Sequence, residues 1–226
     1  MQKLLHRIEI ESAAQPDAAV IWLHGLGADG NDFAVMVPEL QLLGCPPARF
    51  IFPHAPSMPV TLNGGFVMPA WFDILGLDGA RREDDAGIRH SAAAVEALIA
   101  HQVALGIAPQ RIVLAGFSQG CAVVLHTALR HPVRLGGILG LSGYLPLAGT
   151  LATERSAANQ DLPIFLAHGS ADPVIPLDRA EASCRALQAL GYPVQWQTYP
   201  MPHSVHPQEV RDIVRFLKTV LPATSG

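Results

Sequence analysis

Short apolar runs alternate with amphipathic segments along this chain of 226 residues, and this pattern restricts its fold more than any other feature. The runs read HRIEIE, AAVIWL, RFIFP, RIVLAG, LGGILGL, PIFLAHG and VQWQTY. Continuous apolar runs are typical of strands buried on both faces, as in parallel sheets. The pattern therefore predicts an α/β fold in which helices flank both faces of a mostly parallel central sheet. No linker or repeat interrupts it, so residues 1–226 are expected to form one domain.

The segments between these runs have the spacing of amphipathic helices. The predicted helices are about Ala86 to Leu105, Ser118 to Arg130, Leu177 to Leu190, and a last one that begins at Pro207. The stretches 50–72 and 135–153 carry no Asp, Glu, Lys or Arg, but prolines and glycines interrupt both. We interpret them as long loops beside buried strands, because neither would form a continuous helix in lipid.

The charge and the cysteines limit the classes of function. The formal charge is −4 with 15 Lys and Arg, which form no run, so nucleic-acid binding is disfavoured. Cys45, Cys121 and Cys184 form no CxxC pair and are interpreted as buried free thiols in a reducing compartment. The first residues, MQKLLHRIEIE, lack the apolar core of a signal peptide. We expect a cytoplasmic protein without stable membrane insertion.

The segment GFSQG, Gly116 to Gly120, matches the nucleophile pattern G-x-S-x-G directly after the strand RIVLA and before a helix. In this context the serine lies on a tight, strained turn, and the flanking glycines avoid clashes with the neighbouring strand and helix. Ser118 is therefore the predicted nucleophile. The same turn directs the backbone N–H of Gln119 and the positive end of the helix toward a developing oxyanion.

A serine nucleophile needs an imidazole base and a carboxylate that orients the base, and in this fold class both follow the serine in the chain. Asp172 follows the buried run PIFLAHG, which makes it the predicted acid; a turn-forming aspartate before proline is the simpler alternative. His203 and His206 both lie in the loop MPHSVHP before the last helix. Position favours His203, which is nearer the strand end, whereas His206 has a capping role as its alternative.

Taken together, these motifs resemble one family of small α/β-hydrolases. The segments that carry the resemblance are LHGLGADGNDF, MPAWFDI, GFSQG, HGSADPVIP and MPHSVHP, in order from Leu23 to Pro207. They are similar to the carboxylesterases, lysophospholipases and acyl-protein thioesterases. The resemblance implies the α/β-hydrolase fold and a triad of Ser118, Asp172 and His203. It also implies two oxyanion donors, the backbone N–H groups of Leu26 and Gln119.

The resemblance further implies a small-molecule ester or thioester as substrate, no cofactor, no metal ion, and a homodimer. The sequence-based expectation is a carboxylesterase for short to medium acyl chains, with an acyl-protein thioesterase or lysophospholipase on the same machinery as the alternative. The stretches 53–80 and 142–160 are expected to be loops that roof the acyl pocket, with Trp71 and Leu26 as pocket residues.

An oxidoreductase that binds NAD is the alternative from another class, because Gly25, Gly27 and Gly30 form G-x-G-x-x-G after a strand. That fingerprint requires an acidic residue about 20 positions further on to bind the ribose. No Asp or Glu occurs between Glu39 and Asp73, so the cofactor interpretation is disfavoured. The glycines are instead expected to let the backbone bend toward Ser118.

Overall fold

A computed structural model describes residues 4–76 and 83–223, and their main sheet contains the seven predicted strands. These are β1 (Arg7–Glu11), β2 (Ala19–Leu23), β3 (Arg49–Pro53), β6 (Ile112–Phe117), β7 (Gly137–Leu141), β8 (Ile164–Gly169) and β9 (Val194–Tyr199). The helices are α1 (Asn31–Ala34), α2 (Val37–Leu42), α3 (Asp85–Ala104), α4 (Gln119–Arg130), α5 (Ala148–Glu154), α6 (Leu177–Ala189) and α7 (Pro207–Val220). Short 3₁₀ helices cover Thr61–Asn63, Pro109–Arg111 and Ala157–Asn159. The long predicted helices differ from these by about one residue at their ends.

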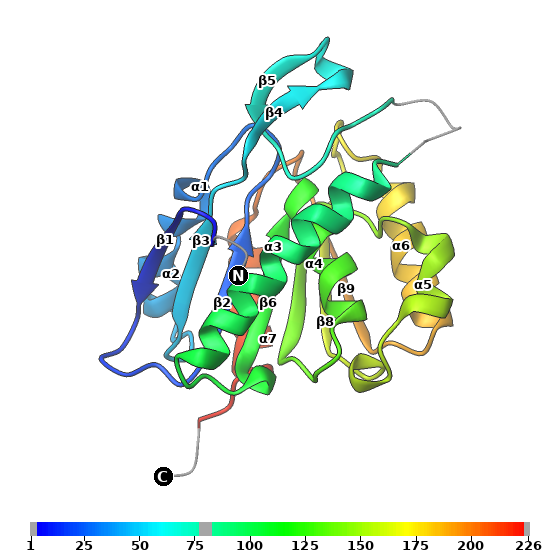
Figure 1. Cartoon of the computed structure of the whole chain (residues 1–226). Helices are drawn as coiled ribbons and strands as arrows, with labels where there is room; N and C mark the ends of the chain where they lie inside the picture. The colour runs from blue at the N-terminus through cyan, green and yellow to red at the C-terminus, as the bar shows by residue number, and fades with distance from the viewer. Residues whose placement is uncertain (1–3, 77–82, 224–226) are drawn as a thin grey trace.

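The main sheet has the order β1-β3-β2-β6-β7-β8-β9 (Figure 1). Only β1 pairs antiparallel with its neighbour β3, and every other pair is parallel. The chain runs outward from β2 to β3 and then crosses over α3 to β6, on the other side of β2. The carboxyl ends of β2 and β6 therefore border the point where the strand order reverses, which is where sheets of this class bind ligands. The mostly parallel sheet predicted from the apolar runs is confirmed.

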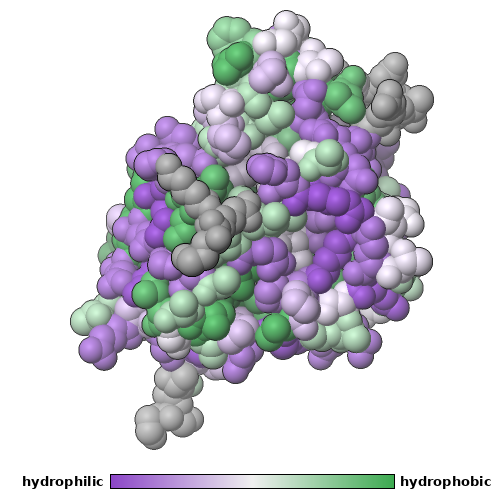
Figure 2. Space-filling view, viewed as in Figure 1, coloured by the Kyte–Doolittle hydropathy of each residue, from purple (hydrophilic) through white to green (hydrophobic). Residues whose placement is uncertain are grey.

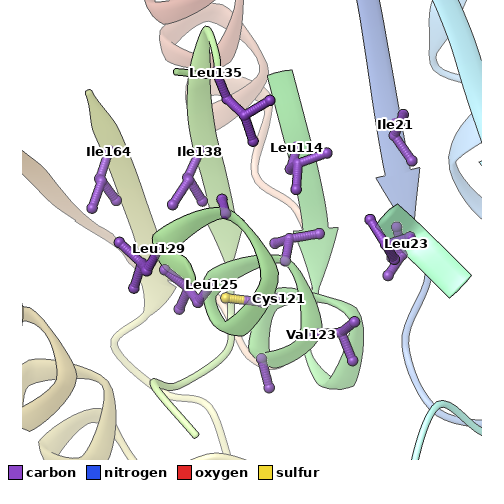
Figure 3. Packing of buried hydrophobic residues seen from close by; sticks show 14 of the residues in the cluster. Ile21, Leu23, Leu114, Cys121, Val123, Leu125, Leu129, Leu135, Ile138 and Ile164 are labelled. Atoms are coloured by element: carbon purple, nitrogen blue, oxygen red, sulfur yellow. The ribbon is translucent and has the colours of Figure 1, made fainter. Parts of the chain in front are cut away.

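Helices cover both faces of the sheet, because successive residues of a strand point to opposite sides. Ile21 and Leu23 of β2 pack with α3 and α4, whereas Val20 and Trp22 pack with α1, α2 and α7. Figure 3 shows α4 lying against β6, β7 and β8, with Leu125 and Leu129 directed at the sheet. Cys121 lies in this layer and is 1% exposed, and burial raises the pKa of its thiol to about 12. It is the core thiol expected from the sequence, as is the buried Cys184, whereas Cys45 is only half-buried.

The stretches 53–80 and 142–160, which were expected to be loops that roof the pocket, contain secondary structure, and this corrects the sequence-based prediction. The first holds an antiparallel hairpin of β4 (Ser57–Val60) and β5 (Phe66–Pro69), and the second holds α5 and the turn Ala157–Asn159. Strands of four residues with prolines have too weak a pattern to be recognised in a sequence. Residues 77–80 of the first segment lie outside the described residues.

The hairpin projects above the edge of the sheet where β3 ends, at the top of Figure 1. Apolar side chains gather there in Figure 2, and Phe66 and Val67 are 68% and 59% exposed. In the described ranges, no helix combines the length and the apolar character that crossing a bilayer requires.

Candidate active site

Ser118 lies between β6 and α4 in a strained backbone conformation, with φ 54° and ψ −117°. Non-glycine residues rarely have positive φ, and such strain is typical of a nucleophile elbow. The flanking glycines are required by close backbone contacts. A Cβ at Gly116 would lie 2.4 Å from the Gly120 carbonyl oxygen, and one at Gly120 would lie 2.4 Å from that of Leu23. The sheet holds the elbow in place, because the Ser118 N–H donates to the Leu141 carbonyl at 2.8 Å.

The loop after β2 lies against the elbow. A Cβ at Gly25 would be 3.3 Å from Phe117 Cδ1 and 3.4 Å from the Ser118 Cβ, so this loop lies within van der Waals contact of the elbow. Gly27 has φ 78°, and its N–H donates to the Pro69 carbonyl at 2.8 Å. Leu26 lies between these glycines, and Gln119 begins α4, where the first N–H groups have no partner within the helix. Both of the expected oxyanion donors therefore border Ser118.

His24, which directly follows β2, braces this loop through both ring nitrogens. Nε2 accepts a hydrogen bond from the Ala55 N–H at 3.0 Å, so Nδ1 carries the proton and donates to the Gly25 carbonyl at 2.7 Å. Burial lowers the pKa of His24 and favours this neutral form. The sequence alone gave His24 no role, although its position directly after a buried strand was an available signal.

Asp172 and His203 are brought together from the loops after β8 and β9. Asp172 Oδ2 accepts a hydrogen bond from His203 Nδ1 at 2.6 Å, and the Asp172 side chain is fully buried. Its Oδ1 accepts from the N–H groups of Val174 and Ile175 at 2.8 and 2.9 Å. Asp172 therefore forms the predicted turn and also holds the imidazole. The His203 ring packs on Phe117, 4.8 Å between centroids, directly beside Ser118 in the chain.

Two other histidines near the carboxyl ends of the strands, His168 and His206, have structural contacts. His168 is fully buried, and its Nε2 donates to the Ile175 carbonyl at 2.8 Å while lying 3.4 Å from Asp172 Oδ2. His206 is the N-cap of α7, where Nδ1 accepts from the Gln208 N–H at 3.1 Å. The capping role considered for His206 is therefore present, whereas His203 is the histidine paired with the acid.

A pocket opens beside Ser118 and encloses about 760 Å³ of empty space, its mouth included. Its lining residues are Leu26, Leu62, Phe72, Asp73, Ile74, Leu75, Gly76, Glu83, Asp84, Ser118, Gln119, Tyr144, Val174, Ile175 and Arg179. The lining combines apolar side chains from the stretch after β5 and from the loop after β8 with four charged residues, which are Asp73, Glu83, Asp84 and Arg179. The Arg179 guanidinium lies over the Tyr144 ring, 3.3 Å from its centroid.

Leu26 and Trp71, the residues expected in the pocket, have different positions. Leu26 lines the cavity, whereas Trp71 is 2% exposed and lies outside the lining, with Phe72 in its place. The Trp71 ring is 5.2 Å from that of His24, and its Nε1 donates to the His24 carbonyl at 2.9 Å. Trp71 therefore supports the loop after β2. The lining residue Arg179 could not be predicted from the sequence, since nothing in its local pattern distinguishes it from any helix-surface arginine.

Comparisons with known proteins agree with this fold. The profile of a family described as phospholipase/carboxylesterase matches residues 5–221. An acyl-protein thioesterase 1 from Gibberella zeae is 42% identical over 220 residues, covering 93% of this chain and 94% of the relative. One from Schizosaccharomyces pombe is 37% identical and covers 98% and 99% of the two chains. The crystal structure of Zea mays acyl-protein thioesterase 2 has a TM-score of 0.84 at 32% identity, over 96% of this chain and 99% of that one.

Proposed function

The chain belongs to the phospholipase/carboxylesterase family of α/β-hydrolases, and we propose that it hydrolyses acyl thioesters and carboxylic esters through Ser118, Asp172 and His203. The observation that carries the proposal is the 2.6 Å pair of Asp172 and His203, beside a serine in an elbow conformation. The relatives are named acyl-protein thioesterases. Thioester hydrolysis therefore takes precedence over the carboxylesterase activity on short to medium acyl chains that was expected from the sequence.

The proposed mechanism transfers the acyl group in two steps. Asp172 accepts the Nδ1–H of His203, which fixes the tautomer in which Nε2 is the base. Nε2 takes the Ser118 proton as Oγ attacks the acyl carbonyl, and the N–H groups of Leu26 and Gln119 stabilise the oxyanion. The carbonyl re-forms as the bond to the thiol or alcohol breaks, and His203 returns the proton to this leaving group. Water then attacks the acyl-enzyme by the same route and releases the acid.

Two features support an acyl substrate in particular. Phe72, Ile74 and Val174 give the pocket wall an apolar part, which suits a hydrocarbon chain attached to the reacting carbonyl. The loop after β2 also differs from a dinucleotide site. Gly25 lies against Ser118, and the helix that follows, α1, comprises only Asn31–Ala34.

The homodimer and the cytoplasmic location stay predictions.

The test of this proposal is chemical labelling together with a substrate panel. A fluorophosphonate should add its mass to the peptide that contains Ser118, and Ser118→Ala should lower kcat by about 10⁴-fold or more on esters and thioesters. The panel compares p-nitrophenyl esters from acetate to palmitate with an acyl-thioester and a lysophospholipid. Full activity of Ser118→Ala, or labelling at another residue, would overturn the proposal. Binding of a nicotinamide cofactor without hydrolysis would favour the oxidoreductase instead.

A further inference from the structure

We propose that the side chain of Gln119 is a positioning residue that sets acyl-chain selectivity, because it fastens one wall of the pocket to the nucleophile elbow. This inference rests on the proposed hydrolase function. It concerns the side-chain amide of Gln119, whereas the mechanism above uses only the backbone N–H of that residue. The wall in question begins at residues 70–73, which follow β5 and are called the strap below.

The Gln119 amide bridges two consecutive residues of the strap. Its Oε1 accepts a hydrogen bond from the Trp71 N–H at 2.8 Å, and its Nε2 donates to the Phe72 carbonyl at 2.6 Å. Gln119 is 3% exposed, so these bonds form away from water. A neutral side-chain amide offers both a donor and an acceptor, which this bridge requires. Loss of either bond leaves a buried backbone group of the strap without a partner.

Further hydrogen bonds join the strap to the rest of the site. Trp71 Nε1 donates to the carbonyl of His24, and Ser91 Oγ of α3 donates to the carbonyl of Trp71. The Ala70 N–H donates to the Pro56 carbonyl at 3.0 Å. The strap is therefore attached to the elbow, to the loop after β2 and to α3. Of these attachments, the two hydrogen bonds of the Gln119 side chain are the ones made by the residue directly after the nucleophile Ser118.

The second half of the strap and the residue after it form part of the pocket wall. Phe72, Asp73 and Ile74 all line the cavity, as does Gln119 itself. A short acyl group needs space only beside Ser118, whereas a longer one must run along this wall. The position of the wall thus affects long acyl chains more than short ones. Fixing it through the elbow aligns the chain with the reacting carbonyl, and small displacements of a bound substrate lower its rate strongly.

The experiment measures kcat/KM for p-nitrophenyl acetate and octanoate with the purified full chain. Gln119→Met keeps the length of the side chain but removes both hydrogen bonds, and we expect the octanoate-to-acetate ratio to fall about tenfold or more. The KM for octanoate should rise as the wall loosens. Gln119→Glu keeps the acceptor for Trp71, but its carboxylate cannot donate to Phe72, so the ratio should fall in the same direction.

Asn159→Leu is the matched control, because Asn159 is a fully buried amide with the same kind of bridging role near the opposite edge of the sheet. Its Nδ2 donates to the carbonyls of His131 and Val133 at 2.7 and 2.9 Å, and its Oδ1 accepts from the Leu135 N–H at 3.0 Å. This variant should lower the melting temperature and leave the octanoate-to-acetate ratio unchanged. Ser91→Ala, which removes another attachment of the strap, should lower the ratio by a smaller factor and covers the case in which Gln119→Met fails to fold.

The outcomes separate this inference from the proposed function. The wild type is expected to hydrolyse both esters. If the Gln119 variants lower kcat for acetate and for octanoate by the same factor, the side chain acts only on the chemical step, and the selectivity role is overturned. An equal change of the ratio in Asn159→Leu would also overturn it, since general loosening would then explain the effect. If the wild type hydrolyses neither esters nor thioesters, the proposed function and this inference fail together.

Discussion

The loop between β9 and α7 has two halves, each with a histidine, and the two histidines have opposite hydrogen-bonding roles. In the first half, His203 Nδ1 lies 2.6 Å from the Asp172 carboxylate, which comes from another strand. In the second half, His206 Nδ1 accepts from the N–H of Gln208, two residues further on. A carboxylate can only accept, so His203 carries its proton on Nδ1, whereas His206 carries it on Nε2. The partner, and not the residue type, selects the tautomer.

The second half is built to hold the loop. Glu209 Oε2 accepts from the His206 N–H at 3.0 Å, which completes a capping box at the start of α7. The His206 ring stacks on Tyr199, whose hydroxyl donates to Asp212 at 2.8 Å. These contacts join the last strand to the last helix. The first half, which lies between them, is thereby kept within reach of Asp172.

The largest difference between the halves is expected in kcat. His203→Ala removes the proposed base and should lower kcat by about 10⁴-fold or more on every ester and thioester, because Ser118 then has no group to take its proton. Steady-state kinetics with p-nitrophenyl butyrate measures the effect. The matched control is His206→Ala in the same assay. If folded His206→Ala lost as much kcat as His203→Ala, the roles assigned to the two halves would be wrong.

The second half should control how stability depends on pH. Glu209 is fully buried, and desolvation raises its pKa from 4.5 to about 7, with the nearby charge of Asp212 adding to the shift. Its Oε1 has no hydrogen-bond partner among the described residues. Because the native state holds the proton more tightly than the unfolded chain, this stabilisation is present below about pH 4.5 and is lost as pH rises through about 7.

Glu209→Gln should remove that pH dependence, since the amide can still accept the His206 N–H but does not ionise. The free energy of unfolding of the variant relative to the wild type should increase by up to about 3 kcal/mol between pH 4.5 and 8. Urea unfolding at a series of pH values measures it. A constant difference in the free energy of unfolding across this range would show that Glu209 does not titrate there. The pH dependence assigned to the second half of the loop would then be wrong.

The smallest effect is expected from the cap alone. His206→Ala should lower the free energy of unfolding by about 1 kcal/mol, because the Gln208 N–H loses its acceptor. That corresponds to about 2–4 °C in melting temperature for a chain of this size. His206→Asn, which supplies a side-chain oxygen of the kind preferred at N-caps, should restore most of the loss. If asparagine gave no recovery, stacking on Tyr199 would outweigh capping as the contribution of His206.

The sequence predicted the elements that have a strong local pattern and missed those without one. Most of the seven strands were found because burial on both faces makes a strand a continuous apolar run, and the long helices because burial on one face imposes a helical period. The strands β4 and β5 have only four residues each and contain prolines, which is too short a pattern to recognise, and the hairpin was taken for a loop. The position of Trp71, outside the pocket lining, has a different reason. Its hydrogen bonds reach His24 and Gln119, 47 and 48 positions away, and no local pattern encodes such contacts.

By itself the sequence determined the strand, turn and helix around Ser118, since only glycine fits at positions 116 and 120, where a Cβ would meet backbone atoms at 2.4 Å. It also placed Asp172 and two histidines in loops at one edge of the sheet. The tertiary structure decided which histidine pairs with Asp172 and which caps α7, and it assigned Trp71 and the Gln119 amide to the support of the pocket wall. Chain spacing constrains the backbone only over a few residues, whereas these pairs form when distant loops meet across the folded sheet.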